Sequence, residues 1–396
     1  MPAGRALDSP ADWAKVSGMP QPVHILHLHS SFDLGGKEAR AIRLMNAWGD
    51  RARHTIVSGV PGMLGARDAI APGIAYEIAQ DPPPLTGRPS VSRYEAIARY
   101  MRRFDLVLSY NWGAIDGVMA RRVFAKAVPP LIHHEDGFNE DEAGGLKAER
   151  NAYRRLALGA AQALVVPSQT LETIALDIWK QPRGRVHRIV NGIPIERYAA
   201  KPAARAIPGF RRKPGEVVIG SLAGLRAVKD LPMLVRAVGG VSGRLQLVIV
   251  GEGPERANIK QAAMAMGIAD QLHLPGFLAD PARYIGLFDI FALSSRSEQF
   301  PISVVEAMAA GLPVVAPPVG DVPVMVSAAN APLICPCPGE VFLRDSLQML
   351  VNDAGLRRRI GAENKARAMA DYDEKTMISA YARLYGAAIG KADLFA

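Results

Sequence analysis

The sequence has little cysteine and no long apolar run, and each shortage excludes a class of protein. Its two cysteines, Cys335 and Cys337, are separated by a single residue. This spacing is poor for a disulfide, and no nearby histidine or further cysteine completes a zinc set. We therefore predict a reducing, cytoplasmic compartment. The longest apolar runs, such as Leu245 to Val250, are strand-sized and fall far short of the roughly 18 residues of a membrane span.

Two further shortages concern the N-terminus and acidic residues. Residues 1–21 lack the apolar core of a secretory signal, so we interpret residues 1–22 as a flexible leader. Lysine and arginine number 47 against 38 acidic residues, a net charge of +9 that favours an anionic partner. No recognition helix or aromatic-interleaved basic strip is present, which argues against nucleic acid. Peripheral contact with an anionic membrane that carries a lipid-linked acceptor is a second reading of this charge.

What the chain does contain is typical of a globular α/β protein. Its 396 residues predict two or three domains, and 49% are hydrophobic. Strand-sized apolar runs alternate with helical patterns, which predicts parallel strands joined by crossover helices. In the first half these runs are Val23 to Leu28, Thr55 to Ser58, Leu106 to Ser109, Leu131 to His134 and Ala163 to Val166. In the second half they are Val217 to Leu222, Leu245 to Val250, Leu272 to Leu274, Ile290 to Leu293 and Pro313 to Ala316.

Helices in the second half are predicted near residues 231–239, 255–266, 301–310, 341–352 and 356–369, with a last one at 375–385. A break rich in proline, alanine and basic residues covers residues 185–192 and 201–215. It divides the chain into a domain of residues 23–195, a linker of 196–215 and a domain of 216–372.

The most informative stretch runs from Glu298 to Val315. It predicts a helix that begins at Pro301, because the N–H that proline lacks has no partner in a first helical turn. Gly311 is expected to end this helix. The first-turn N–H groups of residues 302–304 and the positive end of the helix dipole are suited to bind an anion.

Two glutamates flank this predicted anion site. Glu306 lies about a turn and a half into the helix, too deep for a phosphate but suited to accept hydrogen bonds from ribose hydroxyls. Glu298 precedes the helix and faces the other side of the anion. A diphosphate with a polyol at either end indicates a nucleotide sugar.

The pattern E-x-x-P-x-x-x-x-E-A-M-A-A-G-x-P-V, which starts at Glu298, closely resembles the signature of retaining glycosyltransferases of the GT-B fold, in the large family usually numbered four. The resemblance extends from about residue 23 to 386. It implies two facing Rossmann-like parallel-sheet domains with a central cleft. Residues 23–195 would then be the acceptor side and residues 216–372 the nucleotide-sugar side, and a helix within 373–396 would cross back to the first domain.

The resemblance also assigns donor-binding roles. It implies that Glu306 holds the ribose and that Glu298 lies beside the donor sugar. Phe300, Pro301 and Ile302, with Ser303 at the helix start, would line the donor site with backbone N–H groups.

The nucleotide base has its own expected place. In the family it is held between backbone and side chain after a strand, where this sequence has Gly276, Phe277 and Leu278.

Cations are needed to stabilise the leaving diphosphate. Arg226 and Lys229 could be ordinary helix-start charges, but the family places an arginine and a lysine in this loop as diphosphate clamps. Lys229 matches the lysine, whereas the arginine position holds Gly224. Our hypothesis is that Arg226 reaches the same phosphate from a shifted position.

In the first half, Gly35 and Gly36 belong to a G-G-x-E motif that ends at Glu38. In the family these glycines approach the donor phosphate and open the acceptor pocket. The family commonly has a histidine near the donor sugar in the turn that here reads His-His-Glu-Asp-Gly, and the alignment leaves His134 and Asp136 as alternatives.

Three weaker motifs receive structural interpretations. Gly251 and Gly253 form a G-x-G turn without the third glycine of a dinucleotide site. Asn191-Gly192 predicts a turn with positive φ. Asp371 and Asp373 resemble a metal-binding D-x-D but lie far from the expected cleft, so we predict no metal and no cofactor beside a UDP- or GDP-linked co-substrate.

Together these features predict transfer of a sugar to a hydroxyl acceptor with retention of configuration, in cell-surface polysaccharide or glycolipid synthesis. Arg226 and Lys229 would hold the diphosphate, Glu298 would position the sugar, and His134 or Asp136 would complete the catalytic set. A nucleotide-sugar epimerase of the same fold and a non-catalytic nucleotide-sugar-binding subunit are the alternatives.

Overall fold

A computed structural model describes residues 22–138, 140–142, 144–336 and 339–395. Residues 1–21 of the expected leader lie outside the described residues, and so does Cys337. Within them, no helix combines the length and the apolar character that crossing a bilayer requires.

The first sheet has seven parallel strands in the order β3-β2-β1-β4-β5-β6-β7. The strands are β1 (Val23–His29), β2 (Ala52–Ser58), β3 (Tyr76–Ile78), β4 (Leu106–Tyr110), β5 (Leu131–His134), β6 (Ala163–Val166) and β7 (Val186–Arg188). The helices are α1 (Gly36–Trp48), α2 (Val91–Met101), α3 (Ile115–Val123), α4 (Ala148–Leu158) and α5 (Gln169–Asp177). The sequence interpretation missed β3 and wrongly placed β7 in the break, because a three-residue edge strand has too little apolar pattern to be recognised.

The second sheet has five parallel strands in the order β10-β9-β8-β11-β12. The strands are β8 (Val217–Leu222), β9 (Leu245–Val250), β10 (Leu272–Gly276), β11 (Ile290–Ala292) and β12 (Val314–Val315). The helices are α6 (Leu231–Gly239), α7 (Arg256–Ala265), α8 (Ile302–Ala309), the short α9 (Val322–Met325), α10 (Glu340–Asn352) and α11 (Ala354–Asp371). The prediction of two parallel-sheet α/β domains is therefore confirmed.

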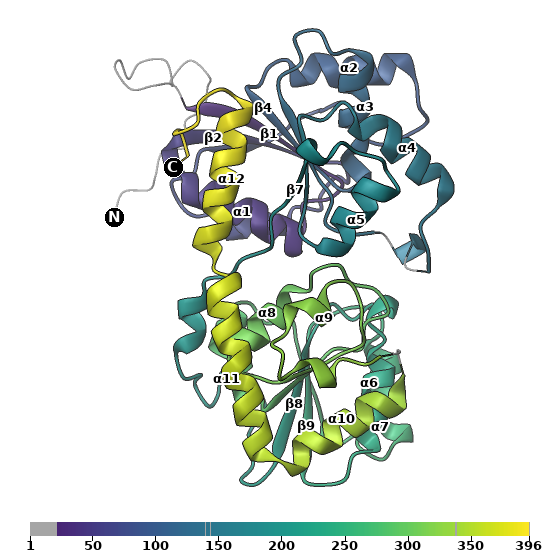
Figure 1. The fold of residues 1–396 in the computed structure, drawn as a ribbon, viewed down its shortest axis with the longest axis vertical. Helices are drawn as coiled ribbons and strands as arrows, with labels where there is room; N and C mark the ends of the chain where they lie inside the picture. The colour runs from purple at the N-terminus through teal and green to yellow at the C-terminus, as the bar shows by residue number, and fades with distance from the viewer. Residues whose placement is uncertain (1–21, 139, 143, 337–338, 396) are drawn as a thin grey trace.

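The two domains lie one above the other, with α11 and α12 (Glu374–Ala388) running along one side of both (Figure 1). On the first domain, Tyr381 and Tyr385 of α12 are fully buried in a cluster with Leu44 and Trp48 of α1. Such burial of large apolar surface is strongly favourable, so α12 is anchored on the domain opposite to the one that precedes it in the chain.

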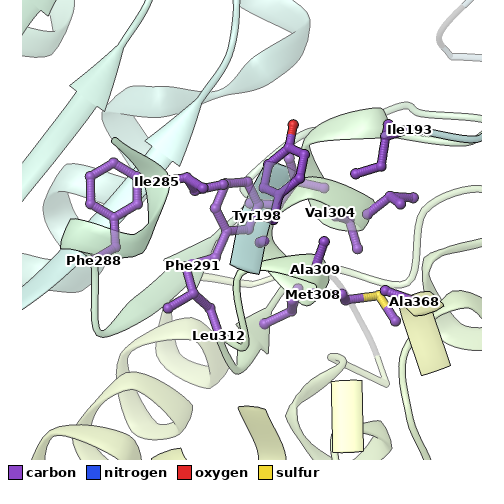
Figure 2. Packing of buried hydrophobic residues seen from close by; sticks show 14 of the residues in the cluster. Ile193, Tyr198, Ile285, Phe288, Phe291, Val304, Met308, Ala309, Leu312 and Ala368 are labelled. Atoms are coloured by element: carbon purple, nitrogen blue, oxygen red, sulfur yellow. The ribbon is translucent and has the colours of Figure 1, made fainter. Parts of the chain in front are cut away.

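In the second domain the core fixes helix α8. Val304 and Met308 are fully buried and pack with Phe291 of β11 and with Leu312. Ile193 and other residues that precede the second sheet in the chain join the same cluster (Figure 2). Because close-packed interiors resist displacement, the N-terminal end of α8 is held at a defined place.

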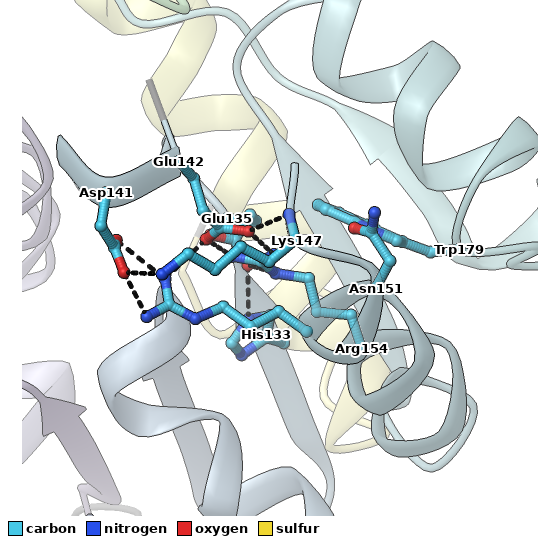
Figure 3. A network of polar contacts seen from close by, with 9 residues as sticks. His133, Glu135, Asp141, Glu142, Lys147, Asn151, Arg154 and Trp179 are labelled. Atoms are coloured by element: carbon cyan, nitrogen blue, oxygen red, sulfur yellow. Dashed lines mark hydrogen bonds and ion pairs between the residues drawn. The ribbon is translucent and has the colours of Figure 1, made fainter. Parts of the chain in front are cut away.

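The first domain contains a charged network in its interior (Figure 3). Arg154 of α4 is fully buried and donates from Nη1 and Nη2 to the Glu142 carboxylate at 3.0 and 3.1 Å. Its guanidinium also lies 5.0–5.3 Å from the ring centres of Trp112, Phe138 and Trp179. These contacts tie the segment that follows β5 to α4.

We expect Arg154→Ala to lower the free energy of unfolding by about 3–5 kcal/mol, because the change leaves the fully buried Glu135 without its arginine and Glu142 with Arg150 as its remaining cation. Denaturant unfolding followed by tryptophan fluorescence measures this, since Trp48, Trp112 and Trp179 lie in the first domain and the second domain has no tryptophan. Arg155→Ala is the matched control. Its side chain is exposed, so the expected change is within about 0.5 kcal/mol. Equal effects of the two substitutions would contradict this account of the network.

Candidate active site

A cleft of about 620 Å³ lies between the two sheets and is lined from both domains. The first domain contributes segments that directly follow β1, β4 and β5, so the cleft lies at the carboxyl ends of its strands, as is usual for open α/β sheets. The lining residues are Ser30, Ser31, Gly35, Gly36, Lys37, Glu38, Asn111, Gly113, Asp136, Gly137, Phe138 and Asn191 from the first domain, and Arg226, Val228, Lys229, Ser297, Glu298, Gln299, Phe300, Pro301, Ile302 and Ser303 from the second.

Helix α8 points its N-terminus into this cleft. It begins at Ile302, one residue later than expected, and Pro301 is its N-cap with φ −67° and ψ 111°. No side chain caps this end, but the Val304 N–H donates to the Pro301 carbonyl at 3.1 Å. The expectation that the Val304 N–H binds an anion is therefore wrong. The N–H groups of Ile302 and Ser303 remain available to bind one. Gly311, with φ +76°, follows the helix end as predicted.

Two cations from the loop after β8 line the same cleft. Lys229 Nζ lies 2.5 Å from Glu298 Oε1, and this oxygen also accepts a hydrogen bond from Ser295 Oγ at 2.7 Å. Arg226 is exposed, and its Nε would lie 3.6 Å from a Cβ atom at Gly224. The Arg226 side chain therefore folds back beside the position at which the family has its arginine.

The G-x-G turn after β9 supports this cation loop. A Cβ atom at Gly251 would lie 1.9 Å from the Ala223 carbonyl oxygen, and one at Gly253 would lie 2.4 Å from that of Leu225. The Leu225 N–H also donates to the Glu252 carbonyl at 2.8 Å. Glycine is needed at 251 and 253 because the turn and the loop after β8 approach each other backbone to backbone. The turn therefore fixes the position of Leu225, which precedes Arg226.

Glu306 does not line the cleft cavity, although the helix that carries it does. Its carboxylate accepts a hydrogen bond from the Tyr198 hydroxyl at 3.1 Å. Burial raises the pKa of Glu306 to about 7, and the hydrogen bond from Tyr198 opposes this rise.

The residues expected around the base also lie outside the cavity lining. Gly276 ends β10 with φ +90°, Phe277 is 61% exposed, and the carbonyl of Leu278 accepts a hydrogen bond from the Tyr284 hydroxyl. The cavity lining thus includes the residues expected at the phosphates, whereas Glu306 lies about one helical turn beyond Ser303 on α8 and residues 276–278 are not part of the lining.

The G-G-x-E segment forms the opposite rim. Gly36 begins α1, and a Cβ atom on it would lie 3.4 Å from Ile302 Cδ1 across the cleft. Glu38 is buried beside Lys37, and burial raises the pKa of its carboxyl group. No side chain caps α1 either, so a second helix N-terminus faces the cleft.

The alternatives His134 and Asp136 occupy different environments. His134, the last residue of β5, is fully buried, and its Nε2 lies 2.6 Å from the Tyr385 hydroxyl. Burial lowers its pKa well below 6.5, so the ring is neutral. Asp136 lines the cleft, and both of its oxygens accept hydrogen bonds from Arg40. Because α12 covers His134, the expectation of His134 at the donor sugar is not met, and Asp136 takes that side of the cleft.

Two asparagines line the cleft that sequence reasoning did not assign to it. Asn111 has φ +56°, and its Oδ1 accepts a hydrogen bond from the Asp136 N–H at 2.7 Å. Asn191 Oδ1 accepts one from Arg40 Nη1 at 3.1 Å. Asn111 directly follows β4, so the rule that ligands bind at strand carboxyl ends could have found it.

The prediction of a turn with positive φ at Asn191-Gly192 needs correction. Neither Asn191 nor Gly192 has a positive φ. Glycine is needed at 192 because a Cβ atom there would lie 2.7 Å from the Asp373 carbonyl oxygen. Asp373 itself caps α12 by accepting from the Lys375 N–H at 2.7 Å. Among the described residues no group of three or more histidine, cysteine or acidic side chains is arranged to hold a metal ion.

Comparison with known proteins agrees with this architecture. Residues 204–367 match the model for glycosyl transferases group 1, and residues 34–197 match that for glycosyltransferase family 4. The lipopolysaccharide core biosynthesis glycosyltransferase LpsD of Rhizobium meliloti is 23% identical over 369 residues, which are 93% of this chain and 99% of LpsD. The N-acetyl-alpha-D-glucosaminyl L-malate synthase of Bacillus anthracis is 22% identical over 52% of this chain and 54% of its own length.

Solved structures show the same fold. The structure of Anabaena Alr3699/HepE in complex with UDP-glucose matches with a TM-score of 0.73 at 22% identity, over 92% of this chain and all of that one. A sucrose-phosphate synthase from Thermosynechococcus elongatus matches with a TM-score of 0.75 at 18% identity, over 94% of this chain and all of that one. The fold is therefore GT-B. Because the two family models together match residues 34–197 and 204–367, which are most of the chain, the chain belongs to the group 1, or family 4, type of glycosyltransferases.

Proposed function

We propose that this protein transfers a sugar from a nucleoside diphosphate sugar to a hydroxyl acceptor with retention of configuration. The observation that carries the proposal is the convergence of the α8 N-terminus, Arg226 and Lys229 on one cleft. The solved relative Alr3699/HepE is described in complex with UDP and with UDP-glucose, which supports a nucleotide sugar as donor.

The donor diphosphate is the first ligand to place. The N–H groups of Ile302 and Ser303 offer hydrogen bonds together with the positive end of the helix, and Arg226 and Lys229 offer full charges. In this arrangement the cations stabilise negative charge that develops on the departing diphosphate, which is the largest demand of the transition state. Lys229 would exchange part of its contact with Glu298 for a phosphate oxygen.

The acceptor enters from the first domain. Asp136 is held by Arg40, and Glu298 is held by Lys229 and Ser295. Carboxylates engaged in this way are suited to orient hydroxyl groups rather than to attack the sugar. We therefore propose attack from the face of the leaving group, where the departing phosphate takes the proton of the acceptor hydroxyl. Closure of the two domains excludes water and limits hydrolysis of the donor.

The setting of this reaction follows from similarity. LpsD is named for lipopolysaccharide core synthesis, which supports a role in cell-surface polysaccharide or glycolipid assembly. We propose that the enzyme works in the cytoplasm and contacts an anionic membrane peripherally through its positive charge.

A panel of UDP- and GDP-linked sugars tests the proposal. The cognate donor at about 100 times its Kd should stabilise the folded protein by about 2.7 kcal/mol, which raises the melting temperature. Incubation with that donor and an acceptor panel should release nucleoside diphosphate, and NMR of the product should show the anomeric configuration of the donor. Conversion of the donor without any acceptor would instead indicate an epimerase, and binding without turnover a non-catalytic subunit.

Arg226→Ala should weaken nucleoside diphosphate binding about tenfold or more, because one charge-assisted hydrogen bond to phosphate is lost. Isothermal titration with UDP and with GDP measures the change. Arg211→Ala removes an exposed arginine of the linker and should leave the affinity unchanged. Unaltered affinity and turnover in the Arg226 variant would show that the shifted arginine does not replace the one missing at Gly224.

The pKa of Glu306, about 7, predicts a pH-dependent affinity for the donor. A carboxylate accepts two ribose hydrogen bonds only when ionised, so affinity should fall as the pH drops through 7, by about tenfold between pH 8 and pH 6. A nucleotide sugar is the suitable probe, since its phosphates do not titrate in this range. Glu306→Gln should flatten the profile, and an identical slope in both proteins would remove Glu306 from the ribose site.

A further inference from the structure

Asp321 forms a direct link between the two domains. It belongs to the second domain, where it directly precedes α9, and its side chain reaches the N-terminus of α5 in the first domain. Oδ2 accepts a hydrogen bond from the Gln169 N–H at 2.5 Å, and Oδ1 accepts from the Thr170 N–H at 3.0 Å and from Thr170 Oγ1 at 2.9 Å. Asp321 is only 4% exposed, so these contacts are shielded from water.

This use of the carboxylate is unusual for its position. Asp321 is the N-cap residue of α9, where an aspartate ordinarily accepts from its own helix, yet it makes no side-chain hydrogen bond there. Helix α5 has its own cap in Ser168, whose Oγ accepts from the Leu171 N–H at 3.0 Å. The N–H groups that Ser168 does not reach, those of Gln169 and Thr170, are satisfied across the domain boundary, where the helix dipole adds to the attraction of the negative charge.

The same residue is bonded to the donor-binding loop. The Asp321 N–H donates to the Gln299 carbonyl at 2.9 Å. The preceding Gly320 has φ +53°, and a Cβ atom on it would lie 2.5 Å from the Glu298 carbonyl oxygen. Because this contact leaves no room for independent movement, a shift of Asp321 carries residues 298–300 with it.

The location of the link makes it suited to control closure. Within the described residues, the other hydrogen bonds and ion pairs that join the two halves involve residues 192–215 or 372–388, such as the bridge of Ile193 with Asp373. In Figure 1, α5 and α9 lie on facing edges of the two domains, to the right of the crossing made by α11 and α12. The contact therefore lies away from the segments at which the chain crosses between the domains. Opening of the cleft would separate it first.

We propose that Asp321 is a positioning residue that latches the cleft closed and, through Gln299, sets the donor loop for transfer. This inference rests on the proposed function for its effect on turnover, but not for its effect on domain closure. When the latch forms, Glu298 and the α8 N-terminus are fixed relative to the first domain, which brings the acceptor. When it breaks, the domains separate about the linker and the diphosphate can leave.

The test compares Asp321→Asn, which keeps the shape of the side chain but offers one acceptor oxygen and no charge, with the wild type. Small-angle X-ray scattering with saturating UDP or GDP should show a larger radius of gyration for the variant. In the transfer reaction, kcat should fall about tenfold while the donor KM changes less than threefold, because the ligands of the donor remain. An unchanged scattering profile together with unchanged kcat would overturn the latch.

Two further variants separate the latch from general stability. Asp353→Ala removes the N-cap of α11, an exposed aspartate that accepts only from the Leu356 N–H of its own helix, and it should lower the melting temperature without changing the scattering profile or kcat. Thr170→Val removes one latch hydrogen bond from the other domain and should act in the direction of Asp321→Asn, with a smaller effect in its presence than alone. Additive effects would contradict the latch. Should no donor be turned over, the scattering comparison still decides the latch, while the proposed function alone fails.

Discussion

The proposed reaction places one electrostatic demand on the structure, which is to hold the two adjacent negative charges of a diphosphate in the cleft between two domains. The second domain answers it with the N-terminus of α8 and with two cations from the loop after β8. The α8 helix can serve because its other face is fully buried in the core with Phe291 and Leu312, which fixes the direction of its free N–H groups. Glu298 faces the same place and pairs with Lys229, which balances this positive charge in the structure described here.

The two domains fix their cleft-lining loops in different ways. In the second domain, glycines allow backbones to approach so closely that the cation loop rests on the G-x-G turn after β9. In the first domain, buried charge holds the loop after β5: Arg154 fixes its far end through Glu142, and Arg40 fixes Asp136.

The two domains are held relative to each other by contacts of two kinds. The linker and α12 connect them along one side, where Tyr381 and Tyr385 bury their rings on the first sheet. Asp321 connects them elsewhere, through hydrogen bonds whose partners are backbone N–H groups. Hydrogen bonds of this kind can break and reform without unpacking a core, whereas the buried α12 contacts cannot.

The sequence by itself determined the two parallel-sheet domains, most strand positions and the position of helix α8. Strands such as Val217–Leu222 and Leu245–Val250 were predicted to the residue because buried parallel strands are continuous apolar runs. Proline and glycine placed helix α8 to within about one residue for local reasons. Only the tertiary structure shows that α12 covers His134 while Asp136 lines the cleft, because α12 lies more than 200 residues away from them in the chain. Asp321 was likewise invisible in the sequence, because its partners are chosen by packing between distant segments and no local pattern records such a choice. Asn111, in contrast, could have been found from its place directly after β4.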